Sequence, residues 1–578
     1  MAVTFNTHSA KARPKALIIS SPSQLPEIVT NALYYGDNLA VLRESIASES
    51  VDLVYLDPPF NSNANYNVLF KSPAGAGSQA QIEAFEDTWH WGPEAEDAFD
   101  QVIQSGNTDA ADLLRAMRSF LGENDMMAYL AMMAIRLLEL HRVLKPTGSL
   151  YLHCDPTASH YLKLTLDSIY DAGNFRNEII WKRTSAHSSA KRFGPVHDSL
   201  LFYTVSDSYT WNKVTQSYSE EYLTLKYRDE DSRGRYRLSD LTGAGIRSGD
   251  SGKPWRAFDP TPLGRHWGVP LAIVASLTSD IGLTTQQKLD LLDEHGFIYW
   301  TPGRGGKPGF PQLKRHLKAG QPVQDVIDDI APINSMAKDR LGYPTQKPVE
   351  LLERILSASS NPGDLVLDPF CGCGTAVHAA QKLGRQWIGI DITHLAVSLI
   401  ERRLKDAFPG IAFEVHGTPK DIDGARDLAT RDKYQFQWWA VSLIDAQPYG
   451  GKKKGADSGI DGLIYFRSDA TTTERAVVSV KGGEHVGVAM IHELKSVMAR
   501  EKAPIGVFLT LAEPTHPMIA EAASAGFYEL GGRKYPRLQI ITIEDALKGE
   551  KPAIPLVDTG AAFKKATRES AAQPKLDF

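Results

Sequence analysis

The sequence predicts an α/β fold built on a doubly wound sheet, and three observations support this. Short apolar runs such as Val51–Leu56 are rich in Val and Leu, which is typical of strands buried on both faces. Stretches with helical spacing, such as Asp125–Leu144, alternate with these runs. Several runs end in an Asp or a glycine loop, and doubly wound sheets hold their ligands at the carboxyl ends of strands.

The length of 578 residues allows three or four domains at about 150 residues each. Hydrophobic residues make up 42% and charged residues 23%, as in ordinary globular proteins, which excludes a disordered chain. No apolar run approaches the ~18 residues of a membrane span, and no signal segment opens the chain. The cysteines Cys154, Cys371 and Cys373 lack the spacing of a zinc site and indicate no disulfides. We therefore expect a folded cytoplasmic protein without a membrane partner.

The predicted elements follow in chain order. The strand Val51–Leu56 ends in the rigid turn Asp57-Pro-Pro-Phe60, and the helix Asp125–Leu144 ends at Lys145-Pro-Thr-Gly148, before a strand over Ser149–Cys154. Beyond residue 335 the pattern predicts a helix over Leu351–Ser359, a strand over Asp364–Asp368, a helix over Ala376–Leu383 and a strand over Trp387–Asp391. The last three elements form a strand-helix-strand unit of a doubly wound sheet.

The segment between these blocks differs in composition. Residues 205–335 are rich in Gly, Pro and aromatic residues with short irregular patterns, which indicates an inserted recognition region. Residues 181–320 hold 20 basic and 14 acidic side chains, against a net charge of −6 for the whole chain, and five of the ten tryptophans. Basic residues among aromatics suit nucleic-acid contacts, whereas an ordinary solvated face with buried tryptophans is the alternative.

A new α/β pattern begins at Tyr434. The predicted organisation therefore has five parts: residues 1–204 and 336–425 for the two halves of the main sheet, 205–335 for the insert, 434–550 for a C-terminal domain, and 551–578 for a loose tail.

A glycine-bearing loop, Asp368-Pro-Phe-Cys-Gly-Cys-Gly-Thr375, joins a predicted strand to a predicted helix. Gly372 and Gly374 permit a ligand to approach the backbone closely, and the helix N-terminus offers free N–H groups to a carboxylate or a phosphate. One strand later comes Asp391, where doubly wound folds bind ribose hydroxyls. A tight turn without a ligand is the alternative, and the acid one strand later makes it less favoured.

The turn Asp57-Pro58-Pro59-Phe60 carries a second set of groups. A carboxylate beside a proline-fixed carbonyl offers two acceptors at a fixed separation, as an exocyclic NH2 with two donors requires. Phe60 can stack on a planar base. The turn therefore predicts a pocket for a flat amine taken out of its stack, with a simple strand-capping turn as the alternative.

Together these motifs resemble the DNA amino-methyltransferases of the β class over about residues 30–405. The matching blocks are Tyr34–Leu39, Ser50–Phe60, Leu144–Leu150, Asn177–Lys182, Tyr343–Pro348 and Asp368–Thr375. Their order, with the catalytic motif first, then the recognition region and then the cofactor motif, is that of the β class. The resemblance implies a Rossmann-like methyltransferase sheet with a target-recognition insert. It also allows a homodimer, which many β-class enzymes form.

The resemblance implies a role for each motif. Asp57, Pro58, Pro59 and Phe60 would hold and activate the flipped base. The implied S-adenosylmethionine site comprises Asp368, Phe370, Cys371, Gly372, Gly374, Thr375 and Asp391, completed by Thr345 and Lys347. The amine would attack the sulfonium methyl directly, so positioning and electrostatics carry the catalysis and the cysteines are interpreted as packing residues. Adenine enzymes of the family usually carry Asp where Asp57 stands and cytosine-N4 enzymes Ser, which favours adenine N6 in double-stranded DNA.

Residues 434–550 resemble, more loosely, the Mrr-like restriction nucleases of the PD-(D/E)XK type. The resemblance rests on Lys454–Phe466 and Ala476–Gly482. It implies that Asp461 binds Mg²⁺ and that Lys481 orients the attacking water. Ser479 stands where the family usually has Glu, Asp or Gln, so one metal ligand is missing from its place.

Glu493 or Asp445 could supply the missing acid, while His485 and His492 are interpreted as solvated side chains. Three functions remain open: a solitary DNA methyltransferase with an inert appendix, a fused restriction-modification enzyme, and a nucleic-acid-binding relic without activity. The intact Asp57 motif argues against a relic. RNA and protein amines also fit the pocket chemically, but the large insert favours duplex DNA, in a restriction-modification or phage-defence setting.

Overall fold

The structure is a computed structural model of the 578-residue chain. It describes residues 31–59, 65–71, 77–86, 89–184, 191, 193–303, 308–334, 337, 340, 341, 343, 345–449, 459–469, 472–555, 568 and 569. Lys213–Gln324 form one compact unit, and the flanking parts Met1–Asn212 and Asp325–Phe578 form the other. The smaller unit falls inside the segment 205–335 that the composition marks as an insert.

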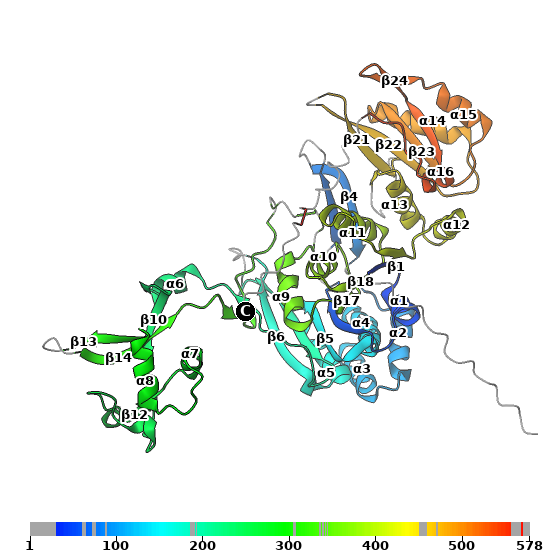
Figure 1. The fold of residues 1–578 in the computed structure, drawn as a ribbon. Coiled ribbons are helices and arrows are strands. Elements are labelled where there is room, and N and C mark those ends of the chain that lie inside the picture. The colour runs from blue at the N-terminus through cyan, green and yellow to red at the C-terminus, as the bar shows by residue number, and fades with distance from the viewer. Residues whose placement is uncertain are drawn as a thin grey trace, which may run out of the picture. The chain divides into compact units, whose positions relative to one another are not determined.

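A nine-stranded sheet is the centre of the larger unit (Figure 1). In spatial order its strands are β16 (Val326–Ile327), β6 (Phe175–Lys182), β7 (His197–Thr204), β5 (Leu144–Cys154), β2 (Val51–Leu56), β17 (Leu365–Asp368), β18 (Gln386–Asp391), β1 (Ala32–Tyr35) and β19 (Glu414–His416). The pairings from β5 to β19 are parallel, and β7 lies antiparallel between β5 and β6. The doubly wound α/β fold is confirmed.

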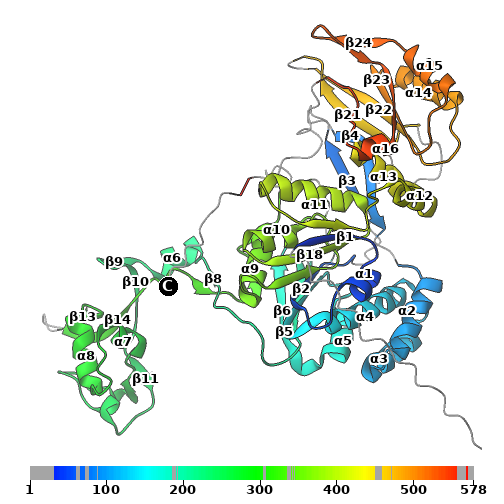
Figure 2. The same ribbon diagram turned by 45° about the vertical axis from the view of Figure 1, so that its right-hand side comes forward.

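Helices cover both faces of this sheet (Figure 2). One face carries α1 (Asn38–Ser45), α2 (Pro93–Gln104), α3 (Thr108–Leu121), α4 (Asp125–Val143) and α5 (Ser159–Tyr170), and the other carries α9 (Val349–Ser359), α10 (Thr375–Lys382) and α11 (His394–Ala407). Asn124 caps α4 by accepting a hydrogen bond from the backbone N of Met127 at 2.9 Å. Apolar residues lie around most of α4, so this helix is buried in the middle of its layer.

The predicted elements of the main sheet are confirmed, with small shifts at their ends. β5 begins at Leu144 rather than at Ser149, and α9 begins at Val349 rather than at Leu351. The sequence pattern missed α2 and α3, which lie in a polar, acidic segment. The buried residues of α2 are two alanines with Phe99 and Val102, so its apolar stripe is too weak to stand out in the sequence.

The smaller unit has its own core. Its main sheet has the order β13 (Ile298–Pro302), β14 (Pro308–His316), β10 (Gly234–Asp240) and β9 (Asp229–Asp231), and its other elements are β8 (Thr215–Gln216), α6 (Glu220–Lys226), β11 (Thr242–Ala244), β12 (Arg265–Trp267), α7 (Leu271–Leu277), α8 (Thr285–Glu294) and β15 (Gln321–Pro322). Trp255 and Trp267 are each 2% exposed and pack with Leu289 and Leu313. The segment with the irregular sequence pattern therefore has a folded core. Trp255 and Trp267 are buried in it and form no base-stacking surface.

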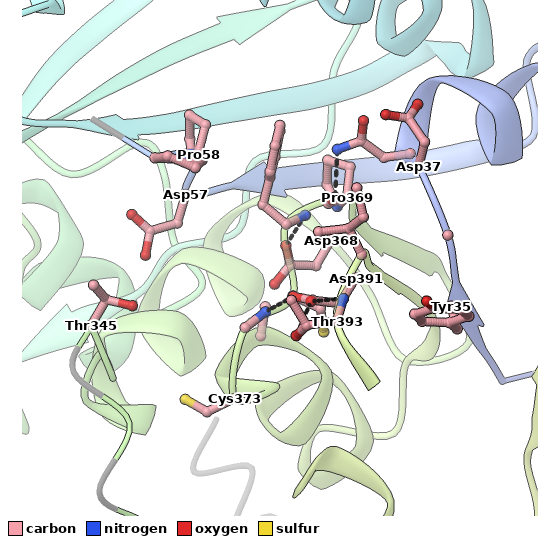
Figure 3. A pocket seen from close by; sticks show the side chains of 18 of the residues that line it. Tyr35, Asp37, Asp57, Pro58, Thr345, Asp368, Pro369, Cys373, Asp391 and Thr393 are labelled. Atoms are coloured by element: carbon pink, nitrogen blue, oxygen red, sulfur yellow. Dashed lines mark hydrogen bonds between the residues drawn. The ribbon is translucent and has the colours of Figure 1, made fainter. Parts of the chain in front are cut away.

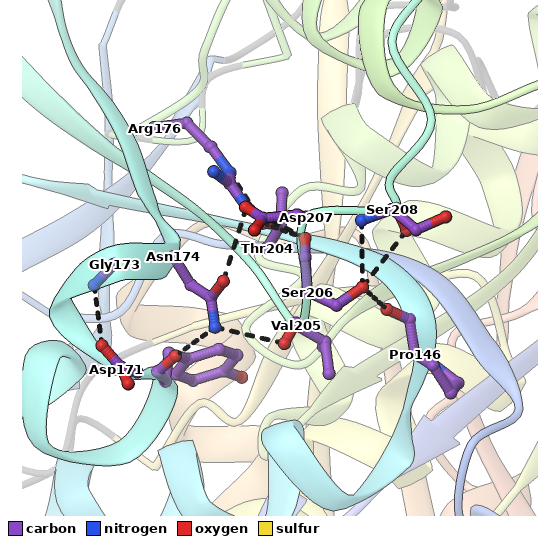
Figure 4. Close-up of polar contacts among 11 residues, drawn as sticks. Pro146, Asp171, Gly173, Asn174, Arg176, Thr204, Val205, Ser206, Asp207 and Ser208 are labelled. Atoms are coloured by element: carbon purple, nitrogen blue, oxygen red, sulfur yellow. Dashed lines mark hydrogen bonds and ion pairs between the residues drawn. The ribbon is translucent and has the colours of Figure 1, made fainter.

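A polar turn holds the chain where it leaves β7 (Figure 4). Arg176 donates from Nε to Thr204 Oγ1 at 2.8 Å and from Nη2 to the carbonyl of Ser206 at 2.9 Å. Asn174 donates from Nδ2 to the carbonyl of Val205 at 3.2 Å. These contacts fix the end of the sheet before the smaller unit begins.

A second sheet follows in the C-terminal part of the larger unit, with the order β20 (Gln447–Pro448), β21 (Gly462–Arg467), β22 (Thr473–Lys481), β23 (Ile505–Thr510) and β26 (Leu538–Thr542). One face packs on α14 (Val488–Arg500) and α15 (His516–Ala523), and the other on α12 (Ile422–Arg431), α13 (Lys433–Leu443) and α16 (Ile543–Leu547). Two hairpins complete the fold, β3 (Asn65–Lys71) with β4 (Gly77–Glu86) and β24 (Phe527–Leu530) with β25 (Arg533–Pro536). Because Ala425 and Leu428 belong to its core, this packing unit begins before residue 434.

In the parts of the chain that the structure describes, no helix is long and apolar enough to cross a membrane. Most of the predicted loose tail lies outside the described residues. Glu569, however, has its carboxylate 3.1 Å from Nε2 of His378, and its backbone N donates to the carbonyl of Ala407 at 3.1 Å. Glu569 therefore contacts α10 and α11, and the loose tail as a whole stays a prediction.

Candidate functional site

A cavity of about 880 Å³ lies where the neighbouring strands β1, β2, β17 and β18 end (Figure 3). It brings together the predicted residues Asp57, Pro58, Pro59, Thr345, Lys347, Asp368, Phe370, Cys371, Gly372, Thr375 and Asp391. Gly374 lies in the same loop but does not line the cavity, and Phe60 lies outside the described residues. Both the size and the position suit a small ligand bound at the switch point of a doubly wound sheet.

Asp57 stands directly after the buried strand β2. Its Oδ2 lies 2.5 Å from Nζ of Lys347, which belongs to the segment before α9. The two side chains are 16% and 9% exposed. The sequence grouped Lys347 with the cofactor residues, whereas the structure places its ammonium against the carboxylate of the base-binding turn.

The glycine loop turns sharply between β17 and α10. Its start is held by Asp368, whose Oδ1 accepts a hydrogen bond from the backbone N of Phe370 at 3.1 Å. Gly372 has a φ of +53°, and a Cβ there would lie 3.2 Å from Cε1 of Tyr343. Gly374 has a φ of +73°, and its Cβ would lie 2.8 Å from Cγ1 of Ile400. The two glycines therefore serve a left-handed turn that is packed closely on both sides.

The cysteines of this loop are buried packing residues. Burial raises the pKa of the Cys371 and Cys373 thiols, and it raises the pKa of Cys154 as well. A thiol with a raised pKa is a poor nucleophile at neutral pH. This agrees with a site that needs no cysteine chemistry.

Asp391 ends β18 with its carboxylate at the cavity. Oδ2 accepts from the backbone N of Gly372 at 2.9 Å, and Oδ1 accepts from the backbone N and the hydroxyl of Thr393 at 2.9 and 2.8 Å. Burial raises the pKa of Asp391 to about 6 even though these three hydrogen bonds favour its charged form. Burial also raises the pKa of Asp368 well above its usual range. The buried carboxyl group of Asp368 and the partly buried one of Asp391 thus line the cavity from adjacent strands.

Sequence reasoning missed a network at the end of β1. Arg136 of α4 is 3% exposed and donates to Oδ1 of Asn38 at 2.6 Å and to Oδ2 of Asp37 at 2.7 Å. Asn38 in turn donates from Nδ2 to the carbonyl of Pro369 at 2.8 Å. All four residues line the cavity, so the network ties the end of β1 to the glycine loop. The sequence feature that could have revealed this network is Arg136 inside an apolar helix, because a buried arginine requires polar partners.

The predicted nuclease residues meet on the C-terminal sheet. The backbone N of Asp461 donates to the carbonyl of Val478 at 2.8 Å, and Asp461 Oδ2 accepts from the backbone N of Val480 at 2.6 Å. Ser479 and Lys481 are two positions apart on β22, so their side chains lie on the same face of the sheet. The structure therefore places Asp461 beside the part of β22 that carries Ser479 and Lys481.

Within the described parts of the chain, no group of three or more His, Cys, Asp or Glu side chains is arranged to hold a metal ion. Asp445 lies 3.0 Å from Nζ of Lys551, and Glu493 is exposed on α14. Neither acid completes a cluster with Asp461. His485 and His492 are exposed, as expected of solvated histidines.

Comparison with known proteins finds two families in this chain. Residues 51–402 match the DNA methylase family, and residues 428–530 match a restriction endonuclease family. The Type II methyltransferase M.EcaI of Enterobacter cloacae is 29% identical over 380 residues, which is 65% of this chain and 70% of that protein. The DNA adenine methyltransferase YhdJ of Escherichia coli is 42% identical over 94 residues, which is 16% of this chain and 31% of that protein.

A solved structure from Thermus thermophilus, described as a DNA modification methylase complexed with S-adenosyl-L-methionine, aligns over 67% of this chain and 97% of its own, with 16% identity and a TM-score of 0.31.

Proposed function

Since this chain belongs to the DNA methylase family, we propose that it moves a methyl group from S-adenosylmethionine to the N6 amine of adenine in duplex DNA. One observation carries the proposal: a single cavity joins the turn at Asp57 to the glycine loop and to Asp391. A methyl group can pass directly from donor to amine only where both are held in one space.

The residues at the cavity fit S-adenosylmethionine. Gly372 leaves the backbone bare beside Tyr343, where a side chain would fill the narrow space. Asp391 offers carboxylate acceptors to ribose hydroxyls, and Thr375 begins a helix whose N-terminus favours a carboxylate. We propose that Asp368, Phe370, Cys371 and Thr345 form the rest of the pocket. When bound, the cofactor supplies a methyl group activated by its sulfonium charge.

Asp57 acts on the other reactant. Its carboxylate accepts hydrogen bonds from the amine of the flipped adenine, and the carbonyl of Pro58 provides a second acceptor at a fixed position. The amine would thus be held ready to take the methyl group that the cofactor supplies, and Asp57 would accept the proton that the methylated amine releases. Lys347 holds the carboxylate in place through its ion pair.

Adenine is favoured over cytosine because Asp57 opens the turn and because a named adenine methyltransferase is among the relatives. N4 methylation of cytosine is the second candidate. Expression in cells without DNA methylases of their own, followed by sequencing for modified bases, tests both. We expect N6-methyladenine at one recurrent sequence, and N4-methylcytosine as the only product would overturn the base assignment. Modification of cellular DNA fits a cytoplasmic protein in a restriction-modification or phage-defence setting.

We propose that the insert reads the target sequence. Lys213–Gln324 form a unit with its own core, and the segment 181–320 has an excess of basic side chains that suits phosphate contacts. Replacing this unit by that of a relative should change the methylated sequence and keep the chemistry. An active chimaera with an unchanged target would contradict this role.

A second activity is proposed for the C-terminal sheet, namely Mg²⁺-dependent cleavage of DNA. It is supported by the match to a restriction endonuclease family and by the hydrogen bond that holds Asp461 against β22, the strand that ends at Lys481. Ser479 leaves the site short of one acid, which should weaken Mg²⁺ binding. A DNA-binding appendix without nuclease activity is the alternative.

A further inference from the structure

One wall of the cavity comes from beyond the DNA methylase match. That match ends at residue 402, and the restriction endonuclease match begins at residue 428. The cavity is nevertheless lined by Arg431, Asp432, Gln435 and Trp438, together with the residues of the proposed cofactor site. The last two belong to α13, which also packs in the core of the C-terminal sheet through Phe436 and Trp439. α13 is therefore shared between the cavity and that sheet.

Gln435 ties α13 to the segment that holds Asp391. Gln435 is 7% exposed, and its Oε1 accepts a hydrogen bond from the backbone N of His394 at 3.2 Å. The residue before His394 is Thr393, whose hydroxyl donates to Asp391. In the described part of the chain, the amide nitrogen of Gln435 donates no hydrogen bond. This nitrogen is accessible at the wall of the cavity, where a ligand with acceptor atoms would be placed to accept a hydrogen bond from it.

Trp438, also on α13, packs against residues around the glycine loop. It is 5% exposed and packs in a cluster with Leu341, Tyr343, Cys373, Leu395 and Leu399. Tyr343 is the side chain that a Cβ on Gly372 would meet. Trp438 of α13 therefore packs in one cluster with Tyr343 and with Cys373 of the glycine loop.

We propose that α13 is part of the S-adenosylmethionine site, with Gln435 as a hydrogen-bond donor to the cofactor and Trp438 as a positioning residue for Tyr343 and the loop. This inference rests on the proposed function. It follows that cofactor binding and the packing of α13 are coupled, because each strengthens the other by the same factor. The packing of the C-terminal part thus affects cofactor binding at the methyltransferase site, whether or not this part cuts DNA.

Calorimetric titration of the full chain with S-adenosylmethionine tests the proposal. Gln435→Leu should raise Kd about tenfold, which corresponds to about one buried hydrogen bond. Trp438→Phe, which keeps an aromatic ring and folds more readily than an alanine variant, should raise Kd by a smaller factor. Tyr434→Ala is the matched control on the same helix, because Tyr434 is exposed and does not line the cavity, and its Kd should equal that of the wild type.

A second measurement does not depend on the variants. Hydrogen exchange of the amides of Lys433–Leu443 in the wild-type chain should slow when S-adenosylmethionine is added. If the wild type binds the cofactor while Gln435→Leu and Trp438→Phe bind equally well and exchange in α13 is unchanged, this inference is overturned and the proposed function stands. If the wild type does not bind the cofactor, both fail.

Discussion

Nζ of Lys347 lies 2.5 Å from Oδ2 of Asp57, although 290 positions separate these residues in the chain. Asp57 follows β2, whereas Lys347 lies just before α9, and both side chains are largely buried. The pair joins the turn proposed to bind the base with the block that the sequence assigned to the cofactor. An ammonium group at this distance fixes the orientation of the carboxylate.

Lys347→Met should slow methyl transfer more than it weakens cofactor binding. Without the ammonium, the carboxylate of Asp57 is no longer held toward the amine, so kcat should fall by about a hundredfold. The Kd for S-adenosylmethionine, measured by calorimetry, should stay near that of the wild type, and Lys347→Arg should retain more activity. If Kd rises by the same factor as kcat falls, Lys347 acts in cofactor binding instead.

Gly374→Val should abolish cofactor binding through the packing of α11 rather than by filling the cavity. The Cβ would lie 2.8 Å from Cγ1 of Ile400, and relief of this clash would shift the start of α10. Gly384→Val is the matched control, since Gly384 has a φ of +72° but nothing within 4 Å of its Cβ. Calorimetric melting should show a loss of about 1–2 kcal/mol for the control and a larger loss for Gly374→Val. Wild-type cofactor affinity in Gly374→Val would refute this placement.

Asp391 should make cofactor affinity depend on pH. Burial raises its pKa to about 6, above the value of about 3.9 in an unfolded chain. The fold thus favours the neutral form, and its contribution to stability is fully present below about pH 4 and is lost as the pH rises through about 6. A ribose hydroxyl donates more strongly to the charged carboxylate, so cofactor affinity should fall as the pH drops through about 6.

Titrations with S-adenosylmethionine between about pH 5 and pH 8 check this expectation, since a pKa of about 6 lies inside that range. Asp391→Asn keeps the shape of the side chain but cannot titrate, so the step near pH 6 should disappear in that variant. A wild-type Kd that is flat across this range would contradict the proposed contact.

The nuclease proposal predicts opposite effects at two neighbouring positions of β22. With Mg²⁺ and unmethylated target DNA, Lys481→Ala should remove any cutting, because it removes the group that orients the water. Ser479→Glu should increase cutting, because it restores a second acid beside Asp461. Gel analysis of the DNA distinguishes the three proteins. If none of them cuts while methylation proceeds, the C-terminal sheet is a DNA-binding appendix.

The parts of the site that could be predicted are local. The turn at Asp57 and the loop with Gly372 follow a strand directly and Asp391 is the last residue of one, so adjacent residues in the sequence suffice to find them. The partner of Asp57 and the network around Arg136 depend on which strands and helices become neighbours. Sequence spacing carries no information about such contacts.

The composition of the insert was harder to interpret for a different reason. A tryptophan among basic residues has the same sequence signature whether it stacks on a base or fills a small core. The structure shows that Trp255 and Trp267 fill a core. Similarly, the acidic segment that forms α2 shows no strong apolar period, because alanines make up half of its buried face.

In the proposed function, Asp57 and the cofactor loop act in one shared cavity, where adenine receives the methyl group. The most direct test incubates the purified full chain with unmethylated genomic DNA and S-adenosylmethionine carrying a labelled methyl group, and identifies the labelled nucleoside by mass spectrometry. We predict label in N6-methyladenine for the wild type and none for Asp57→Ala, with equal cofactor Kd for both proteins. Label in N4-methylcytosine alone, or undiminished methylation by Asp57→Ala, would contradict the account.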